Sequence, residues 1–207
     1  MSMPGRFIVL EGGEGAGKST QMRAVQDWLE AQGRRTQRTR EPGGSPLAEA
    51  IRNVVLGTWT EGMDATTEAL LIFAARAAHL RATILPALQA DTDVISDRFV
   101  DSSYAYQGAG RGLGFERIAE LERMVLGDVH PDLVIVLDIE PEVGLARIRA
   151  RGSNNRFDEE TLEFMHRVRA AYLQRAVADP HRHAVIDAAQ PLAQVSENLL
   201  RVLESRL

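Results

Sequence analysis

Short runs of apolar residues recur along the chain, and polar or glycine-rich segments separate them. Uninterrupted apolar runs are typical of strands that are buried on both faces, as in a parallel sheet. Phe7–Leu10 and Leu133–Leu137 are the clearest of these runs, and weaker patterns predict strands at 35–39, 94–96 and 183–187. The chain is therefore expected to contribute strands to one sheet along its whole length.

Between these runs, apolar residues recur at the three- and four-residue spacing of amphipathic helices. Residues suited to helix ends support the pattern, with Asp64 as an N-cap, Pro141 in a first turn and Gly33 as a C-cap. Proline disrupts helix geometry, so the longest helix should bend near Pro86. The expected helices are one through Met22, Val25 and Leu29, and others at 47–56, 64–89, 115–126, 141–151, 159–178 and 191–207.

Strands that alternate with helices predict an α/β fold, in which a parallel sheet is covered on both faces. Ligands of such folds bind at the carboxyl ends of the strands. Glu11–Glu14, Arg40–Glu41 and Asp97–Arg98 each follow a predicted strand, so we expect them to share one crevice. Residues 101–114, rich in Gly, Ser and Tyr, are expected to form a functional loop.

The segment after the first strand carries a phosphate-binding motif. Residues 12–19, GGEGAGKS, match G-x-x-x-x-G-K-[ST] at every fixed position. Glycines allow consecutive N–H groups to point at phosphate oxygens, and the following helix adds its N-terminal dipole. Lys18, the only lysine among 24 basic residues, suits the β- and γ-phosphates, and Ser19 suits Mg²⁺. The nucleotide-binding set predicted here is Gly12, Gly13, Glu14, Gly15, Ala16, Gly17, Lys18, Ser19 and Thr20.

Composition narrows the class of protein further. The 207 residues are 44% hydrophobic and 26% charged, as expected for one soluble domain over residues 1–207. The net charge of −5 argues against broad binding of nucleic acid or anionic membranes. Cysteine is absent, the histidines suggest no metal site, and neither a signal peptide nor an apolar run of membrane-spanning length is evident. These features predict a cytoplasmic enzyme.

Further segments of the chain carry motifs beyond the phosphate-binding loop. They are EPGG at 41–44, FAAR at 73–76, DRFVDSSYAYQG at 97–108, GRG at 110–112, PDL at 131–133, and RARG at 149–152 followed by Arg156. Together they resemble the thymidylate kinase family, whose members phosphorylate dTMP to dTDP with ATP. A guanine-reading N-K-x-D string, which a GTPase would need, is absent. The resemblance covers nearly the whole chain and implies a P-loop NTPase fold of the three-layer α/β/α type, as in nucleoside-monophosphate kinases with a short lid. It also implies dTMP and ATP as substrates, Mg²⁺ as a cofactor, and a homodimer formed by the long helix and the helix at 115–126.

The resemblance implies an acceptor site across the crevice from the phosphate-binding motif. Arg98 would orient the acceptor phosphate together with Arg52, which could equally be a solvated helix residue. Arg76 lies in an apolar helix, where a charge needs a partner, and would meet the carbonyl edge of thymine. Glu14 would reach the 3′-hydroxyl of the sugar, and Glu41 the acceptor phosphate or the metal shell. Base and sugar contacts are expected from Ser103, Tyr106 and Gln107, although Tyr104 and Tyr106 could also be core aromatics.

The base-stacking position departs from the family pattern. One helical turn before Arg76 the family commonly has an aromatic residue, whereas this chain has Ile72 at that position and Phe73 next to it. Either Ile72 packs on the base and Phe73 belongs to the core, or a small helix rotation brings Phe73 to the base. We favour Ile72. The departure leaves open a kinase for another monophosphate, such as dUMP, dCMP or a guanylate.

Phosphoryl transfer requires positive charge beside the γ-phosphate. Some family members place an arginine inside the phosphate-binding motif, where this chain has Gly15. The bacterial pattern places it in a lid, here at about 149–159, where Arg156 matches; Arg149 and Arg151 would assist with ATP or form a solvated helix end.

Asp97, at a strand end, would hold Mg²⁺ together with Ser19, or would only cap the strand. The expected catalytic set is Lys18, Arg156, Arg98 and Glu14. The alternative from another class is a nucleotide-binding regulatory protein that has lost turnover.

Overall fold

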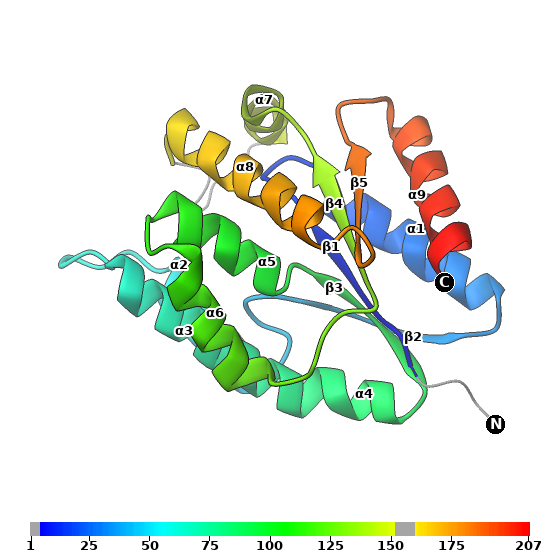
Figure 1. The fold of residues 1–207 in the computed structure, drawn as a ribbon, viewed down its shortest axis with the longest axis horizontal. Helices are drawn as coiled ribbons and strands as arrows, with labels where there is room; N and C mark the ends of the chain where they lie inside the picture. The colour runs from blue at the N-terminus through cyan, green and yellow to red at the C-terminus, as the bar shows by residue number, and fades with distance from the viewer. Residues whose placement is uncertain (1–4, 152–159) are drawn as a thin grey trace.

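The computed structural model describes residues 5–151 and 160–207. Its centre is a sheet of five parallel strands in the order β2-β3-β1-β4-β5 (Figure 1). The predicted strands are confirmed, with ends that shift by two residues at most. Their bounds are β1 (Phe7–Glu11), β2 (Arg35–Arg40), β3 (Thr92–Asp97), β4 (Leu133–Asp138) and β5 (His183–Asp187).

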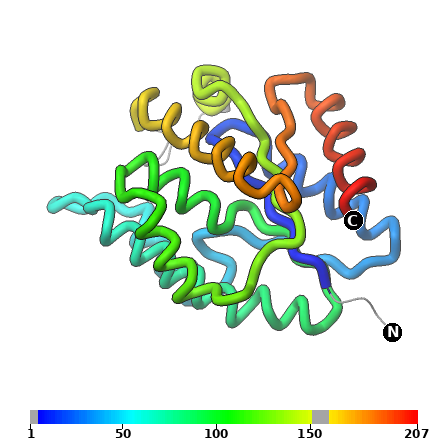
Figure 2. The backbone as a smooth tube through the Cα atoms, viewed as in Figure 1, coloured from blue at the N-terminus to red at the C-terminus, as the bar shows by residue number. Residues whose placement is uncertain are grey.

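Helices cover both faces of this sheet, so the three-layer α/β arrangement is confirmed. Along β1, Ile8 and Leu10 pack with α1 and α9, the first and last helices, which lie side by side (Figure 2). Phe7 and Val9 point to the opposite face, where α3 to α6 and α8 pack. The helix bounds are α1 (Lys18–Ala31), α2 (Pro46–Leu56), α3 (Ala65–His79), α4 (Leu85–Gln89), α5 (Val100–Ser103), α6 (Phe115–Leu126), α7 (Pro141–Arg151), α8 (Leu162–Ala178) and α9 (Leu192–Arg206).

The expected loop at 101–114 is wrong over most of its length. The chain is helical there, first as α5 and then as a π-helical segment, Tyr104–Gly110. Its glycines allow close packing rather than turns, because a Cβ on Gly110 would lie 2.5 Å from the ring of Phe164 in α8. Burial of Tyr104 and Tyr106 in the core compensates for the weak helix propensity of this segment.

Two helix boundaries also differ from the expectation. The helix expected from 159 begins at Leu162, because the hydroxyl of Thr161 accepts the N–H of Phe164 and caps it. The long helix continues from Ala65 to Gln89, but its α-helical geometry gives way to a π-helical segment at Leu80–Ile84. This segment directly precedes Pro86, whose missing N–H removes a helical hydrogen bond.

The same long helix contradicts the expectation that the chain has no apolar run of membrane-spanning length. By length and composition, the helix Ala65–Gln89 is long and apolar enough to cross a membrane. Its most apolar stretch of 18 residues has a mean hydropathy of 1.3, and 44% of that stretch is buried inside the protein. A core helix of a globular protein passes the same test, and here Arg76 and Glu68 lie within the helix and pair with neighbouring elements.

Candidate active site

The phosphate-binding segment links β1 to α1 as a tight loop. Gly15 has a φ of 74°, and a Cβ there would lie 2.2 Å from the carbonyl oxygen of Gly144 in α7. Only glycine therefore fits at this position. The Lys18 ammonium lies inside the loop, 3.2 Å from the Gly12 carbonyl and 3.3 Å from that of Gly13. Burial and the charge of Arg98 lower the pKa of Lys18.

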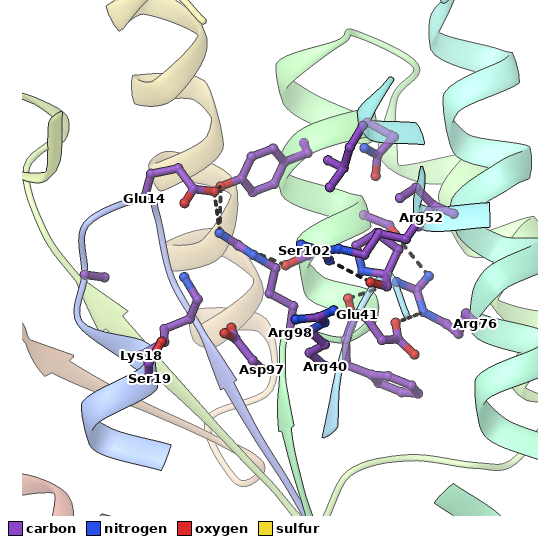
Figure 3. A pocket seen from close by; sticks show the side chains of 18 of the residues that line it. Glu14, Lys18, Ser19, Arg40, Glu41, Arg52, Arg76, Asp97, Arg98 and Ser102 are labelled. Atoms are coloured by element: carbon purple, nitrogen blue, oxygen red, sulfur yellow. Dashed lines mark hydrogen bonds and ion pairs between the residues drawn. The ribbon is translucent and has the colours of Figure 1, made fainter. Parts of the chain in front are cut away.

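A cavity of about 270 Å³ opens at the carboxyl ends of β1, β2 and β3, as expected for the shared crevice. Figure 3 shows Lys18 and Ser19 on one side, Arg52 and Arg76 on the other, and Arg98 between them. Gly12, Gly13, Phe73 and Arg149 do not line it. The predicted residues that do line it are Glu14, Gly15, Ala16, Gly17, Lys18, Ser19, Thr20, Glu41, Arg52, Ile72, Arg76, Asp97, Arg98, Ser103, Tyr106 and Gln107.

Arg98 crosses the middle of the cavity toward the loop. Its Nη2 donates to Glu14 Oε1 at 2.6 Å and to the Tyr106 hydroxyl at 3.1 Å, and its Nη1 donates to the Gly12 carbonyl at 3.0 Å. Burial alone would raise the pKa of Glu14, but Arg98 and Lys18 outweigh it and lower that pKa. The arginine thus offsets the carboxylate that the phosphate-binding loop carries.

Arg76 is only 1% exposed and has the partner that a buried charge requires. Its Nε donates to Glu41 Oε2 at 2.7 Å, Nη1 to Ser103 Oγ at 3.0 Å and Nη2 to the Phe99 carbonyl at 3.0 Å. The other oxygen of Glu41 lies 3.0 Å from His79 Nδ1. In this geometry Glu41 holds Arg76 against the cavity wall.

The two residues proposed for base stacking lie in different surroundings. Ile72 lines the cavity, whereas Phe73 is buried in the core and lies under the Arg76 guanidinium, with 4.5 Å from Cζ to the ring centroid. Gln107 also lines the cavity, and its side-chain amide donates to Glu68 Oε1 at 2.8 Å. Arg52 is anchored as well, since its Nη1 donates to the Pro42 carbonyl at 2.7 Å. The cavity therefore has an apolar wall with fixed polar groups around it.

The residues expected to hold Mg²⁺ fit a hard cation. Asp97 Oδ1 is buried and has no hydrogen-bond partner within the described residues, and both Asp97 and Ser19 line the cavity. Carboxylate and hydroxyl oxygens are suitable ligands for Mg²⁺, which usually completes its shell with water and substrate phosphates. Within the same described residues, no cluster of three or more His, Asp or Glu side chains could enclose a metal without such help.

Most of the expected lid is not described by the structure. Arg156 and the side chain of Arg151 lie outside the described residues, and Arg149 is exposed on α7. Arg147 was not predicted, yet its Nη1 donates to the Ala188 carbonyl at 3.0 Å and lies 3.4 Å from that of Gly15. It connects helix α7 to the phosphate-binding loop.

The structure corrects the expectation for Glu11, which was placed in the crevice by its position at a strand end but is fully buried beneath Arg98 and does not line the cavity. Sequence reasoning also missed the contacts of Ser102 and Tyr172 with Arg98. Glu11, Ser102 and Tyr172 form a buried hydrogen-bonded group with its guanidinium. Burial, with the charge of Asp101, raises the pKa of Glu11 to about 7. A carboxylate that directly follows an apolar strand was the available signal for Glu11. Tyr172 occupies an ordinary core position of α8 and carries no such signal.

Comparisons with known proteins agree with this geometry. The family model described as thymidylate kinase matches residues 10–199. The chain is 54% identical over 205 residues to the thymidylate kinase of Pseudomonas fluorescens Pf-5, covering 99% of this chain and 98% of that one. It is 53% identical, with the same coverage, to the thymidylate kinase of Pseudomonas savastanoi pv. phaseolicola.

A solved structure gives the same result. The crystal structure of thymidylate kinase from Ehrlichia chaffeensis superposes with a TM-score of 0.79 at 32% identity, and the match covers 98% of this chain and 99% of that one. The motif-bearing loop, the arginine-lined cavity and these full-length matches agree, and the chain belongs to the thymidylate kinase family.

Proposed function

We propose that this protein transfers the γ-phosphoryl group of ATP to dTMP and produces ADP and dTDP. The observation that carries the proposal is a single cavity with two phosphate-binding sides. One side is the glycine-rich loop with Lys18. On the other side Arg52 and Arg98 suit the acceptor phosphate, and Arg76 lies beside them where the base would bind. Two nucleotides that approach from these sides would meet at the centre of the cavity. Family membership supports both substrates.

The loop binds ATP through its backbone N–H groups and the Lys18 ammonium. An oxygen of the dTMP phosphate attacks the γ-phosphorus, a new P–O bond forms, and the bond to the β–γ bridging oxygen breaks to release ADP. No general base is needed, because the attacking phosphate is already ionised. Mg²⁺, held by Ser19 and Asp97, would neutralise charge on the phosphates.

The acceptor binds across from the loop. Arg98 and Arg52 orient its phosphate, as guanidinium groups suit a doubly charged oxyanion. Arg76, fixed by Glu41, faces the base together with Ile72 and Gln107. Ser103 and Tyr106 complete the base and sugar site, and Glu14 accepts the sugar 3′-hydroxyl.

A lid at about 149–159 completes the active site. Arg156 approaches the γ-phosphate as the lid closes, and closure excludes water that would otherwise accept the phosphoryl group. Arg149 and Arg151 assist with ATP. Support for this step comes from α7, which leads into the lid and packs on the phosphate-binding loop through Gly144 and Arg147.

The protein acts as a cytoplasmic homodimer with small-molecule partners. The net charge of −5 argues against nucleic acid as a partner. Support for a dimer comes from two apolar side chains on the adjacent helices α3 and α6, since Leu70 is 52% exposed and Met124 is 73% exposed.

Steady-state kinetics with a panel of monophosphates tests the substrate. With saturating ATP and Mg²⁺, formation of ADP is measured against dTMP, dUMP, dCMP and GMP. We expect kcat/KM to be highest for dTMP. A preference for dCMP or GMP would overturn the substrate assignment, and ATP binding without turnover on any acceptor would favour a regulatory protein.

A further inference from the structure

Arg98 has a backbone conformation that needs support. Its φ is 72°, in the left-handed region that a long side chain rarely adopts. The two peptide N–H groups on either side of its Cα are held by successive residues of β1. The N–H of Arg98 donates to the Leu10 carbonyl at 2.9 Å, and that of Phe99 donates to Glu11 Oε1 at 2.8 Å. The end of β1 therefore supports the turn that directs Arg98 into the cavity.

Glu11 also caps the helix that follows this turn. The N-cap residue of α5 is Phe99, which has no side-chain oxygen to accept the first helical N–H groups. Glu11, at the end of β1, supplies the acceptor instead. Its Oε1 accepts the N–H of Phe99 and, at 3.1 Å, that of Ser102. The N–H groups at the start of a helix have no acceptor within the helix, so Glu11 satisfies donors that would otherwise lack a partner.

The second oxygen of Glu11 reaches the guanidinium indirectly, through the hydroxyl of Ser102. Ser102 Oγ donates to Glu11 Oε2 at 2.6 Å and lies 2.8 Å from the Tyr172 hydroxyl. Arg98 Nη1 donates to both of these hydroxyls, at 3.2 Å to Ser102 and 2.9 Å to Tyr172. One buried carboxylate thus fixes the backbone of Arg98 and orients the hydroxyls that its side chain contacts.

We propose that Glu11 is a positioning residue for phosphoryl transfer, holding the Arg98 guanidinium in the place from which it orients the acceptor phosphate. Glu11 is 0% exposed and does not line the cavity, so it acts through Arg98 and touches neither substrate. The inference rests on the role proposed above for Arg98.

A double-mutant cycle tests this coupling. Glu11→Ala removes both the cap and the hydroxyl contact, and we expect kcat/KM for dTMP to fall about a hundredfold, as misplacement of a positioned group can cause. The KM for ATP should stay within about twofold of wild type, because Lys18 and the loop backbone bind ATP without Arg98. In an Arg98→Ala background, Glu11→Ala should lower kcat/KM by less than about twofold further.

If Glu11→Ala does not fold, Glu11→Gln replaces it in the same double-mutant cycle with Arg98→Ala. It keeps the volume and one accepting oxygen but replaces the other with an amide donor, so its effect should be smaller and equally dependent on Arg98.

Asp93→Asn is the matched control. Asp93 is also fully buried near a strand end and accepts the Arg6 N–H at 2.8 Å and Arg34 Nε at 2.9 Å, but it lies near the amino ends of the strands, away from the cavity at their carboxyl ends. Its loss should lower the melting temperature and leave kcat/KM per folded molecule unchanged.

Two results would overturn the proposal, for different reasons. If Arg98→Ala lowers kcat/KM for dTMP but the Glu11 and Arg98 effects multiply independently, Glu11 is only structural. If Arg98→Ala has no effect on dTMP kinetics while wild type phosphorylates dTMP, the role of Arg98 is wrong and the inference fails with it, although the enzyme's activity stands.

Discussion

At the scale of single residues, the site uses its one lysine and its several arginines in different ways. Lys18 is held among backbone carbonyls of its loop, where a compact ammonium fits and a planar guanidinium would not. Arg76 and Arg98 each use several N–H groups at once, toward a carboxylate, hydroxyls and carbonyls. Such multiple contacts hold a guanidinium in one orientation before a ligand arrives, which lowers the entropic cost of binding.

The role of Arg156 gives the first prediction. Arg156→Ala should lower kcat by about a thousandfold, because an arginine beside the transferred phosphoryl group typically contributes that much or more. The affinity for ATP, measured by equilibrium binding, should change little, since the loop and Lys18 bind the nucleotide. Arg201→Ala is the control, because Arg201 is an exposed residue of α9, and its kcat should match that of wild type. Wild-type turnover in Arg156→Ala would show that the lid assignment is wrong.

Neighbouring side chains Ile72 and Phe73 should respond differently to truncation. Ile72→Ala removes apolar surface from the cavity wall, so the KM for dTMP should rise about tenfold. Phe73→Ala opens a hole in the core and should lower the free energy of unfolding by about 3–5 kcal/mol. Urea denaturation and dTMP kinetics on both variants compare the two effects. A larger rise in KM from Phe73→Ala, at equal folded fraction, would place the aromatic ring at the base instead.

At the scale of elements, the site depends on contacts between segments far apart in the chain. A Cβ on Gly144 of α7 would lie 2.3 Å from the Glu14 carbonyl, so the phosphate-binding loop and α7 touch backbone to backbone. On the other side of α5, Asp101 accepts from Arg175 Nε of α8 at 2.6 Å and lies 2.8 Å from His183 Nε2 of β5. This cluster joins α5 to two elements that do not line the cavity.

The Asp101 cluster predicts a pH dependence of stability. Burial opposes protonation of His183, but the hydrogen bond and charge of Asp101 outweigh it and raise the pKa of His183 above its ordinary 6.5. A raised pKa in the folded state means that this stabilisation is full below 6.5 and is lost as pH rises through the folded value. The pKa of Asp101 is lowered from 3.8, against burial and because of His183 and Arg175, so its contribution is lost only in stronger acid.

Unfolding by urea at pH 6 and pH 9 measures this effect. Wild type should lose more free energy of unfolding between these pH values than His183→Gln, which cannot be charged. The control is His130→Gln, since His130 is an exposed histidine away from the Asp101 cluster and its replacement should leave the wild-type difference intact. Equal pH dependence in wild type and His183→Gln would contradict a charged His183 in the folded protein.

At the scale of the whole molecule, the homodimer proposed above would use the exposed apolar residues Leu70 of α3 and Met124 of α6. Replacing both with Glu buries charge in such an interface and should shift the protein from dimer to monomer in sedimentation velocity. Val177→Glu, on a highly exposed position of α8, is the control and should leave the sedimentation coefficient unchanged. A monomeric wild type, or an unchanged dimer in the double variant, would contradict this interface.

Much of the fold was predictable from local pattern. The strands and most helix ends were predicted because apolar runs and capping residues act within a few neighbours, as Asp64 does by accepting the N–H groups of Thr66 and Thr67. The segment 101–110 was not, because Gly108 packs against α6 and Gly110 against α8, and the local sequence does not contain these helices. The crevice was predicted from strand ends, and most of the expected site residues that the structure describes line it.

By itself, the sequence determined the glycine-rich loop, its lysine and the family, because these depend on residue types at fixed short spacings. Only the tertiary structure decided which groups hold the arginines. Glu41 comes to Arg76, and Glu11 and Tyr172 come to Arg98, from other strands and helices. The physical reason is that a buried charge takes its partners from whatever the packing of the sheet brings within hydrogen-bonding distance, and no local spacing along the chain encodes that distance.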